Sequence, residues 1–320
     1  MHAHISASFF LQRIKNPSIA GVLSRLLPTL ALCKCARMTE TEKQKAKPFL
    51  KWVGGKQRLA DELLKHAPKS FGTYYEPFLG AGALFFALAP KRAVLSDSNK
   101  NLIAAYLAVR GNAPLLILHL ETLGRFHNEK FFYETRDAFN DEDGREISAF
   151  GIIQAARFIY LNKACFNGLY RESAEGKLNV PFGHNSKPPS FNIENIKACQ
   201  RALQSATLIA SKFLPVSSRA QAGDFVYFDP PYVPISKGSN FTAYTADKFG
   251  DEDQKLLRDH ALWLCRRGVH VMLSNSSAPR VADLYSKDFD LHEVRALRAV
   301  NSNGEGRGKV AEYIIVGRPQ

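Results

Sequence analysis

Cysteine is scarce in this chain, which has five among 320 residues, at positions 33, 35, 165, 199 and 265. An odd number of cysteines cannot pair completely, and the Cys-Lys-Cys order at 33–35 lacks the two-residue spacing of metal and redox motifs. We therefore expect reduced thiols, as in cytoplasmic proteins, and no metal site.

Long apolar runs are also missing, and so are acidic residues near the N-terminus. No apolar run reaches the ~18 residues of a membrane span, so we expect no membrane partner. Residues 1–37 contain five Lys or Arg and no Asp or Glu, a pattern that also suggests an organelle transit peptide. Met38-Thr39-Glu40 is a plausible alternative start, so we interpret residues 1–47 as a disordered basic extension or a mis-assigned start, without a catalytic role.

Positive charge exceeds negative charge in the rest of the chain too. The whole sequence has 43 Lys and Arg against 30 Asp and Glu, a net charge of +13, and removing the five cations of residues 1–37 leaves +8 (13 minus 5). Basic proteins favour polyanions through phosphate contacts and counterion release. In residues 163–187 the cations interleave with aromatic rings, which suits groove binding and base stacking; they are Lys163, Arg171, Lys177, His184 and Lys187 among Phe166, Tyr170 and Phe182. The alternative is a polar hairpin with a solvated face.

The tetrapeptide Asp229-Pro230-Pro231-Tyr232 directly follows Phe225–Phe228, an apolar run that is typical of a buried strand. It should therefore lie at the carboxyl end of a strand, where open α/β sheets bind ligands. Two prolines fix the backbone and remove two N–H donors, so the Asp229 carboxylate and the Pro230 carbonyl become rigid acceptors beside the Tyr232 ring. This pocket suits a planar heterocycle with an exocyclic amino group, such as adenine or cytosine. The alternative is an ordinary turn.

A strand, a glycine turn and a helix are indicated by residues 74–86, where Gly80 and Gly82 permit a tight turn and the close approach of a ligand. The next strand ends in Asp97, which is placed to accept hydrogen bonds from ribose hydroxyls. Phe85 stands where a dinucleotide fingerprint has its third glycine, and the turn contains no basic residue. The pattern therefore favours an adenosine ligand without phosphates, such as S-adenosylmethionine.

The segment at 49–56, Phe-Leu-Lys-Trp-Val-Gly-Gly-Lys, resembles a phosphate-binding loop at its end. That interpretation fails, because Leu50 replaces the first glycine of the motif and Gln57 replaces its Ser or Thr. Trp52 beside two glycines can instead stack on a ligand, and Lys56 can face a carboxylate such as that of a methionine moiety. The alternative is a loop before a helix with a solvated lysine.

The chain resembles Dam-type DNA adenine-N6 methyltransferases of the D12 group from about residue 48 to residue 316. The resemblance rests on Phe-Leu-Lys-Trp-x-Gly-Gly-Lys at 49–56, Glu-Pro-Phe-x-Gly-x-Gly at 76–82, Ser-Asp-x-Asn at 96–99, Tyr-Leu-Asn at 160–162, Phe-Asn-Gly-Leu-Tyr-Arg at 166–171, Asn-Val-Pro-Phe-Gly at 179–183, Asp-Pro-Pro-Tyr at 229–232 and Phe-Thr-x-Tyr at 241–244. The glycine turn comes first, as in the family's α arrangement, in which a DNA-reading domain lies between the turn and Asp-Pro-Pro-Tyr.

The resemblance implies a role for each matching residue. The implied cofactor is S-adenosylmethionine, and its contacts are Trp52, Lys56, Glu76, Phe78, Gly80, Gly82, Asp97 and Asp229. The implied catalytic loop is Asp229, Pro230, Pro231 and Tyr232, and the residues that enter double-stranded DNA at a GATC site are Lys51, Phe166, Asn167, Leu169 and Arg171. Phe166 stands where relatives often have Tyr, which removes one hydroxyl and leaves the aromatic wedge.

The expected fold is α/β: a doubly wound, Rossmann-like methyltransferase sheet with an inserted, mostly helical DNA-recognition domain. Residues 48–111 and 206–320 form the S-adenosylmethionine-binding catalytic domain, and residues 112–205, with the basic hairpin, form the inserted domain. We predict βα units at 72–110, strands at 206–210, 225–228, 269–273 and 313–316, and helices at 151–158 and 254–267. We further expect a cytoplasmic, nucleoid-associated monomer of bacterial or phage type.

The expected chemistry follows from the target amine. The lone pair of adenine N6 is delocalised into the ring, so acceptors at Asp229 and Pro230 should hold the two N–H bonds and aim the lone pair at the methyl group. The base must leave the duplex first, with Tyr232 stacking on it. Two alternatives are cytosine-N4 methylation, against which Asp before Pro-Pro and the motif order argue, and a catalytically silent DNA-binding module. Cytosine-C5 methylation is excluded, because its nucleophile is expected in a Pro-Cys dipeptide and the chain has none.

Overall fold

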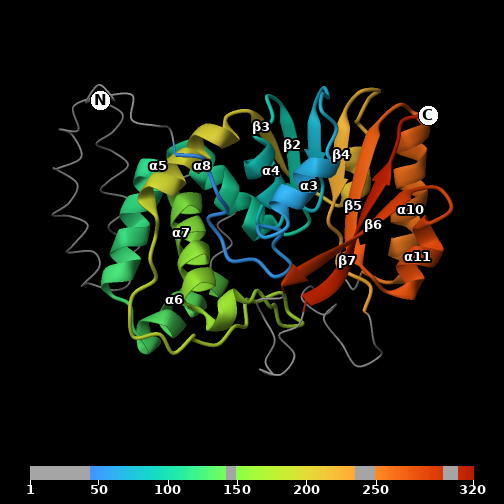
Figure 1. Cartoon of the computed structure of the whole chain (residues 1–320). Coiled ribbons are helices and arrows are strands. Elements are labelled where there is room, and N and C mark those ends of the chain that lie inside the picture. The colour runs from blue at the N-terminus through green and yellow to red at the C-terminus, as the bar shows by residue number, and fades with distance from the viewer. Residues whose placement is uncertain (1–43, 142–148, 235–248, 298–308) are drawn as a thin grey trace. The chain divides into compact units, whose positions relative to one another are not determined.

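One sheet organises the part of the chain that the computed structural model describes, residues 44–141, 149–234, 249–297 and 309–320 (Figure 1). Its strand order is β3-β2-β1-β4-β5-β7-β6. The strands are β1 (Tyr74–Glu76), β2 (Ala93–Asp97), β3 (Ala206–Ala210), β4 (Phe225–Phe228), β5 (His270–Ser276), β6 (Asp290–Leu297) and β7 (Lys309–Gly317). β7 runs antiparallel to β5 and β6, and the other neighbouring strands are parallel. The predicted strands are confirmed, whereas β6 has no counterpart among them.

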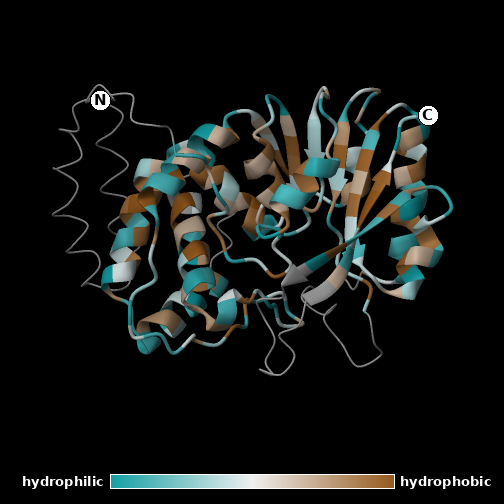
Figure 2. Cartoon of the chain, viewed as in Figure 1, coloured by the Kyte–Doolittle hydropathy of each residue, from teal (hydrophilic) through white to brown (hydrophobic). Residues whose placement is uncertain are grey.

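The sheet is covered on both faces, and β4 shows this most clearly. Phe225 and Tyr227 belong to one buried cluster and Val226 and Phe228 to a second, because successive side chains of a strand point to opposite faces. A strand that is buried on both faces needs an unbroken apolar sequence, as β4 has. Hydrophobic residues accordingly follow the strands in Figure 2, while hydrophilic residues mark the outer parts of the helices.

Helices flank the sheet and fill the long connection between β2 and β3 (Figure 1). They are α3 (Ala60–His66), α4 (Ala83–Leu88), α5 (Lys100–Arg125), α6 (Glu129–Asp141), α7 (Ala149–Ala164), the 3₁₀ turn η2 (Phe166–Gly168), α8 (Ile193–Leu203), α9 (Phe213–Ser217), α10 (Asp251–Arg266) and α11 (Pro279–Tyr285). Leu102 and Tyr106 of α5 contribute to the first buried cluster, and Leu257 and Leu264 of α10 to the second. Different helices therefore cover the two faces, as in a doubly wound fold.

α5 leads from the sheet into the helical connection, and it is bent on the way. Asn112 has a non-helical backbone (φ −150°, ψ 69°), and Pro114, which has no N–H to donate, follows it. The Asn112 side chain accepts a hydrogen bond from the Leu115 N–H at 3.1 Å and so caps the second half of the helix. The bend lies beside the predicted domain boundary at 111/112, and the division into domains stays a prediction.

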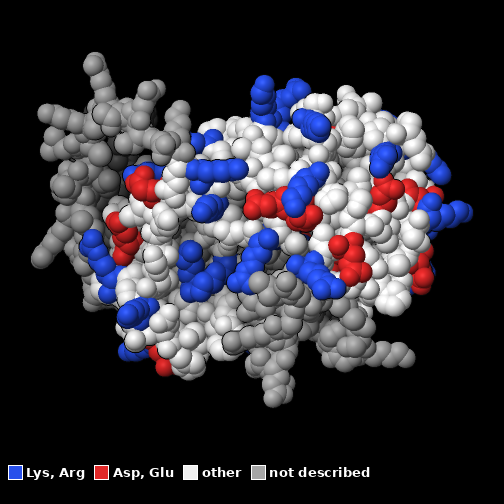
Figure 3. Space-filling model, viewed as in Figure 1, with Lys and Arg blue, Asp and Glu red and all other residues white. Residues whose placement is uncertain are grey.

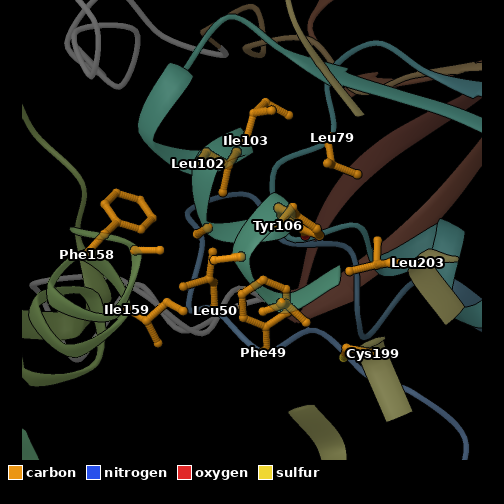
Figure 4. Close-up of a cluster of buried hydrophobic side chains, with 14 of the residues drawn as sticks. Phe49, Leu50, Leu79, Leu102, Ile103, Tyr106, Phe158, Ile159, Cys199 and Leu203 are labelled. Atoms are coloured by element: carbon orange, nitrogen blue, oxygen red, sulfur yellow. The ribbon is translucent and has the colours of Figure 1, made fainter. Parts of the chain in front are cut away.

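The helical connection shares its core with the sheet. Figure 4 shows Tyr106 of α5 close to Phe49, which precedes α3, with Phe158 of α7 and Cys199 of α8 in the same cluster. All four side chains are buried, and the rings of Phe49 and Tyr106 meet edge to face with centroids 4.8 Å apart. Burying a side chain of this size contributes about 1.5–3 kcal/mol. Buried apolar surface therefore holds the connection in place beside the sheet.

By length and composition alone, α5 could cross a membrane, and it is the one helix of the described residues with these properties. Several of its apolar side chains are buried inside the protein, however, and Leu102, Ile103, Leu116 and Leu120 are at most 2% exposed. The bend at Asn112 also interrupts the helix. We therefore interpret α5 as a core helix.

Some expectations fall on residues that the structure leaves undescribed. These are the N-terminal extension up to residue 43, with Cys33 and Cys35, and the Phe-Thr-x-Tyr motif at 241–244. The other cysteines, Cys165, Cys199 and Cys265, are buried free thiols. Burial raises the pKa of Cys165 to about 11, so this thiol is protonated and unreactive at neutral pH.

Candidate active site

The strand order reverses between β1 and β4, and the candidate site lies at the carboxyl ends of these two strands. Tyr74 pairs with Phe225 and Tyr75 with Val226 in parallel register. The glycine turn after β1 and the loop after β4 therefore leave the sheet side by side. Open α/β sheets bind their ligands at such a switch point. The fold thus brings together two motifs that are far apart in the sequence.

Asp229 is the first residue after β4, and 19% of its side chain is exposed. Its Oδ1 lies 3.0 Å from the Lys56 Nζ, but the contact lacks hydrogen-bond geometry, and Oδ1 has no hydrogen-bond partner among the described residues. Burial raises the pKa of Asp229 to about 6, Lys56 opposes this rise, and the Glu312 carboxylate adds to it. Asp229 is therefore mostly ionised at neutral pH and presents a buried acceptor.

Lys56 is buried against the same loop, with 7% of its side chain exposed. Its Nζ donates to the Gly54 carbonyl at 2.6 Å and lies 4.5 Å from the centroid of the Tyr232 ring. The carboxylate of Asp229 and the ring face both stabilise this cation. Lys56 thus has a carboxylate partner within the protein, and its contact with a cofactor carboxylate stays a prediction.

Polar side chains of α10, β5 and β7 anchor the loop after β4. The Tyr232 hydroxyl donates to Glu312 Oε2 at 2.9 Å. Gln254 Nε2 donates to the Pro231 carbonyl at 2.9 Å, and Asn275 Nδ2 donates to Gln254 Oε1 at 3.1 Å. Gln254 and Asn275 are at most 3% exposed, so these bonds form in a site from which water is excluded. The network fixes the backbone on which the two predicted acceptors lie.

Sequence reasoning misses these anchors. Asn275 lies between two serines at the carboxyl end of an apolar strand, and a polar run at that end is a usable signal. Glu312 and Gln254 give no such signal, because charged and amide side chains are ordinary on strands and helices at the surface. Only the fold, which places β7 beside β5 and brings α10 to the loop, shows what they do.

The glycine turn after β1 is bound to the end of β2. The Gly80 N–H donates to Asp97 Oδ2 at 3.0 Å, and the Asn99 N–H donates to Asp97 Oδ1 at 2.9 Å. Gly80 and Gly82 have positive φ, at 46° and 65°, and a Cβ on Gly80 would lie 2.9 Å from Trp52 Cδ1. Glycine is therefore required at this turn. Burial raises the pKa of Asp97, and the contact of Asp97 with a ribose stays a prediction.

The other residues predicted to contact the cofactor differ in exposure. Trp52 is half-buried and stacks on Tyr170, with ring centroids 5.4 Å apart, and Phe78 is also half-buried. Glu76 is 2% exposed and accepts a hydrogen bond from the Tyr74 hydroxyl at 2.9 Å. Burial raises the pKa of Glu76 to about 8, so its carboxyl group is mostly protonated at neutral pH. It can therefore donate a hydrogen bond as well as accept one.

The residues predicted to enter DNA lie on two segments. Lys51, Phe166, Asn167 and Arg171 are exposed, and Phe166 stands out because 48% of this large apolar side chain is exposed. Leu169 is half-buried and packs against the main hydrophobic cluster. Lys and Arg side chains spread over the face seen in Figure 3, with Asp and Glu in separate groups among them. Such a surface suits a polyanionic partner.

Two aromatic residues of the basic stretch are not at the surface. Tyr170 and Phe182 are each 6% exposed, and Phe182 packs against Phe132 with ring centroids 5.4 Å apart. The expectation that the rings among these cations are available for base stacking is therefore wrong for Tyr170 and Phe182. Their apolar area is worth more in the core than at the surface. Phe166 is the exposed ring of the three.

Acidic, histidine and cysteine side chains do not gather into a metal centre in the part of the chain that the structure describes. No group of three or more such side chains there could hold a metal ion. The buried carboxyl groups near the switch point are instead held by Lys56, by backbone N–H groups and by Tyr74.

Comparisons with known proteins agree with this geometry. The family described as D12 class N6 adenine-specific DNA methyltransferase matches residues 52–300. Type II methyltransferase M1.LlaDCHI of Lactococcus lactis subsp. cremoris is 39% identical over 280 residues, which cover 87% of this chain and 98% of that protein. DNA adenine methylase of Escherichia coli (strain K12) is 34% identical over 278 residues, which cover 86% of this chain and 97% of that protein. DNA N-6-adenine-methyltransferase of Escherichia phage P1 is 31% identical over 289 residues, which cover 88% of this chain and 37% of that protein.

The seven-stranded order and the site at its switch point define a Rossmann-like methyltransferase fold. The chain belongs to the D12 class of N6 adenine-specific DNA methyltransferases. It is therefore an enzyme that methylates adenine in DNA, and the predicted Rossmann-like methyltransferase sheet and the predicted enzyme class are confirmed. Membership of an adenine-specific class also argues against cytosine-N4 methylation and against a silent DNA-binding module.

Proposed function

We propose that this enzyme transfers the methyl group of S-adenosylmethionine to N6 of an adenine that has rotated out of duplex DNA, within the sequence GATC. The observation that carries the proposal is the Asp229 carboxylate, which directly follows β4 at the switch point; its buried Oδ1 lies 3.0 Å from Lys56 Nζ and has no partner with hydrogen-bond geometry among the described residues. Buried polar atoms are normally satisfied, and the amino group of a base is a donor that satisfies this one.

The residues around the glycine turn suit S-adenosylmethionine as the donor. Asp97 and Asp229 are carboxyl groups whose pKa values are raised by burial, and Glu76, which is mostly protonated at neutral pH, can donate or accept a hydrogen bond. A cationic ligand, such as a sulfonium compound, offsets the free-energy cost of burying carboxylates. Gly80 allows the backbone to approach the ligand, and Asp97 would accept hydrogen bonds from its ribose hydroxyls. When bound, the donor supplies an electrophilic methyl group.

Asp229 and Pro230 would accept the two N–H bonds of the target amine. This contact directs the nitrogen lone pair at the methyl group for in-line displacement, and it stabilises the positive charge that N6 gains. Lys56 Nζ lies 3.0 Å from the same carboxylate, so the arriving amino group must share or replace its contact. The methylated amine then loses a proton to water, and Asp229 is not required as a general base.

The target base must leave the helix, because its N6 is paired inside the duplex. Tyr232, whose hydroxyl is fixed by Glu312 at 2.9 Å, would offer its ring as a stacking surface for the rotated base. Phe166, which is 48% exposed, would fill the space that the base leaves behind. The choice of GATC rests on the resemblance of Lys51 and residues 166–171 to the DNA-reading positions of the family.

Methyl transfer to defined duplexes tests the proposal. The enzyme is incubated with methyl-labelled S-adenosylmethionine and with duplexes that contain or lack one GATC, and the nucleosides are separated after digestion. We expect label in N6-methyladenine from the GATC duplex alone. Equal labelling of adenine in both duplexes would overturn the GATC assignment, and label in cytosine would overturn the target. DNA binding without any label would overturn the choice of donor.

A further inference from the structure

Asn162, near the end of α7, fastens the segment that carries Lys51. Its Oδ1 accepts a hydrogen bond from the Lys51 N–H at 2.9 Å, and its Nδ2 donates to the Lys51 carbonyl at 2.7 Å. Nδ2 also reaches the Gly168 carbonyl at 3.5 Å. Asn162 is 4% exposed, so water cannot replace these bonds when they are lost. One side chain therefore holds both segments that are predicted to enter DNA.

The two segments also touch directly, at Gly168. A Cβ on this residue would lie 2.5 Å from Lys51 Cβ and 2.7 Å from Lys51 Cδ. Gly168 has φ 66°, which glycine adopts without strain, and it is the last residue of η2, whose first residue is the exposed Phe166. Any displacement of Lys51 towards η2 is therefore resisted by the turn itself.

The Lys51 segment continues into the cofactor turn. Trp52 stacks on Tyr170, with ring centroids 5.4 Å apart, and its Cδ1 would lie 2.9 Å from a Cβ on Gly80. Gly80 in turn donates its N–H to Asp97 at 3.0 Å. Packed contacts thus run from Asn162 through the Lys51 segment to the glycine turn.

We propose that Asn162 is a positioning residue for sequence discrimination: it holds Lys51 and η2 in one arrangement that fits the preferred base pairs, and Trp52 connects that arrangement to the glycine turn. This role rests on the proposed function, because it takes Lys51 and η2 as DNA-reading elements. Asn162 is buried and acts through Lys51 and Gly168, without touching DNA. Its loss should leave DNA binding in place and weaken the choice between duplexes.

Asn195 of α8 provides a matched control. Its Oδ1 accepts from the Lys47 N–H and its Nδ2 donates to the Lys47 carbonyl, both at 2.9 Å, and it is 7% exposed. The same pair of hydrogen bonds therefore holds the backbone at Lys47, four residues before Lys51. Lys47 has no predicted contact with DNA. Asn162→Ala and Asn195→Ala should lower the melting temperature by similar amounts.

Fluorescence anisotropy separates the two variants. The duplex that the wild-type enzyme binds most tightly, whatever its sequence, serves as the preferred duplex. The discrimination ratio is the dissociation constant of a duplex with one outer base pair changed, divided by the dissociation constant of the preferred duplex. Asn162→Ala should lower this ratio about tenfold, the discrimination that one bidentate base contact provides, whereas Asn195→Ala should leave it unchanged. A wild-type ratio in Asn162→Ala, or an equal loss in Asn195→Ala, would overturn the proposal.

A pair of glycine variants covers the case in which Asn162→Ala does not fold. Gly168 and Gly176 both have positive φ, at 66° and 74°, so alanine strains the backbone at both positions. A Cβ at Gly168 would contact Lys51, whereas a Cβ at Gly176 would have no atom within 4 Å. Gly168→Ala should lower the ratio and Gly176→Ala should not; equal effects would overturn the proposal. DNA binding does not require methyl transfer. A wild-type enzyme that discriminates between the duplexes but does not methylate adenine would therefore contradict the proposed function and leave the role of Asn162 in place.

Discussion

Lys56 and Glu312 act in opposite directions on the pKa of Asp229, so the charge state of this carboxyl group can be tested. Burial raises its pKa from the ordinary 3.8 to about 6, although Lys56 Nζ lies 3.0 Å away and favours the ionised form. Glu312 adds to the rise, because a second negative charge disfavours ionisation. The ionised form is the one that accepts from the amine, so kcat/KM should fall as the pH falls through the pKa of Asp229, which is about 6 before the donor binds.

Two substitutions should move this midpoint in opposite directions. A neighbouring opposite charge lowers a carboxyl pKa, so Lys56→Met, which keeps most of the side-chain volume, should raise the midpoint well above that of the wild-type enzyme. Glu312→Gln removes the negative charge and keeps an oxygen for the Tyr232 hydroxyl, so its midpoint should lie below that of the wild-type enzyme.

The assay is the pH dependence of kcat/KM for duplex DNA at a saturating concentration of methyl donor, so it reports the pKa of the donor-bound enzyme before DNA binds. The cationic donor lowers the pKa of Asp229 in every variant, so each midpoint is compared with that of the wild-type enzyme under the same conditions. Lys65→Met is the control: Lys65 is exposed and pairs with Glu62, so its loss should leave the midpoint unchanged. Midpoints that move in the same direction in Lys56→Met and Glu312→Gln, or that do not move at all, would refute the role of Asp229 as the titrating acceptor.

Three further changes probe the surroundings of the site. Gln254→Ala removes the donor to the Pro231 carbonyl and should lower the single-turnover rate about tenfold with little change in DNA affinity; equal losses in both would contradict this. Arg171→Ala should relax sequence discrimination, and an unchanged preference in competition assays would show that base reading lies elsewhere. Gly80→Ala brings a Cβ within 2.9 Å of Trp52. It should cost about 1–3 kcal/mol in urea unfolding and weaken donor binding in calorimetry.

The central strands could be predicted because they are buried on both faces. β4 is an unbroken apolar run, and the pattern needs no knowledge of its neighbours. β6 could not be recognised in the same way, because His292, Glu293 and Arg295 interrupt its apolar residues. Among the strands of the described residues it lies at the edge and pairs only with β7, and exposed edges carry charged residues that prevent further pairing.

The motifs of the site could be predicted where their chemistry is local. Two prolines after a strand stiffen a loop, and Gly80 marks a turn, whatever lies around them. The ion pair between Lys56 and Asp229 could not be predicted from either motif alone, because it depends on how two loops meet at the switch point. Tyr170 shows the opposite error: its cationic neighbours suggest a surface residue, but Trp52 covers its ring.

Asp229→Asn separates the charge of Asp229 from its shape, because it keeps the size of the side chain, removes the negative charge and replaces one acceptor oxygen with a donor. The measurement is the single-turnover rate of methyl transfer to duplex DNA, with DNA affinity and melting temperature measured on the same preparation. We expect a loss of rate of at least about a hundredfold, with DNA affinity little changed. Transfer at close to the wild-type rate would contradict the claim that the negative charge of Asp229 stabilises the target amine as N6 becomes positively charged.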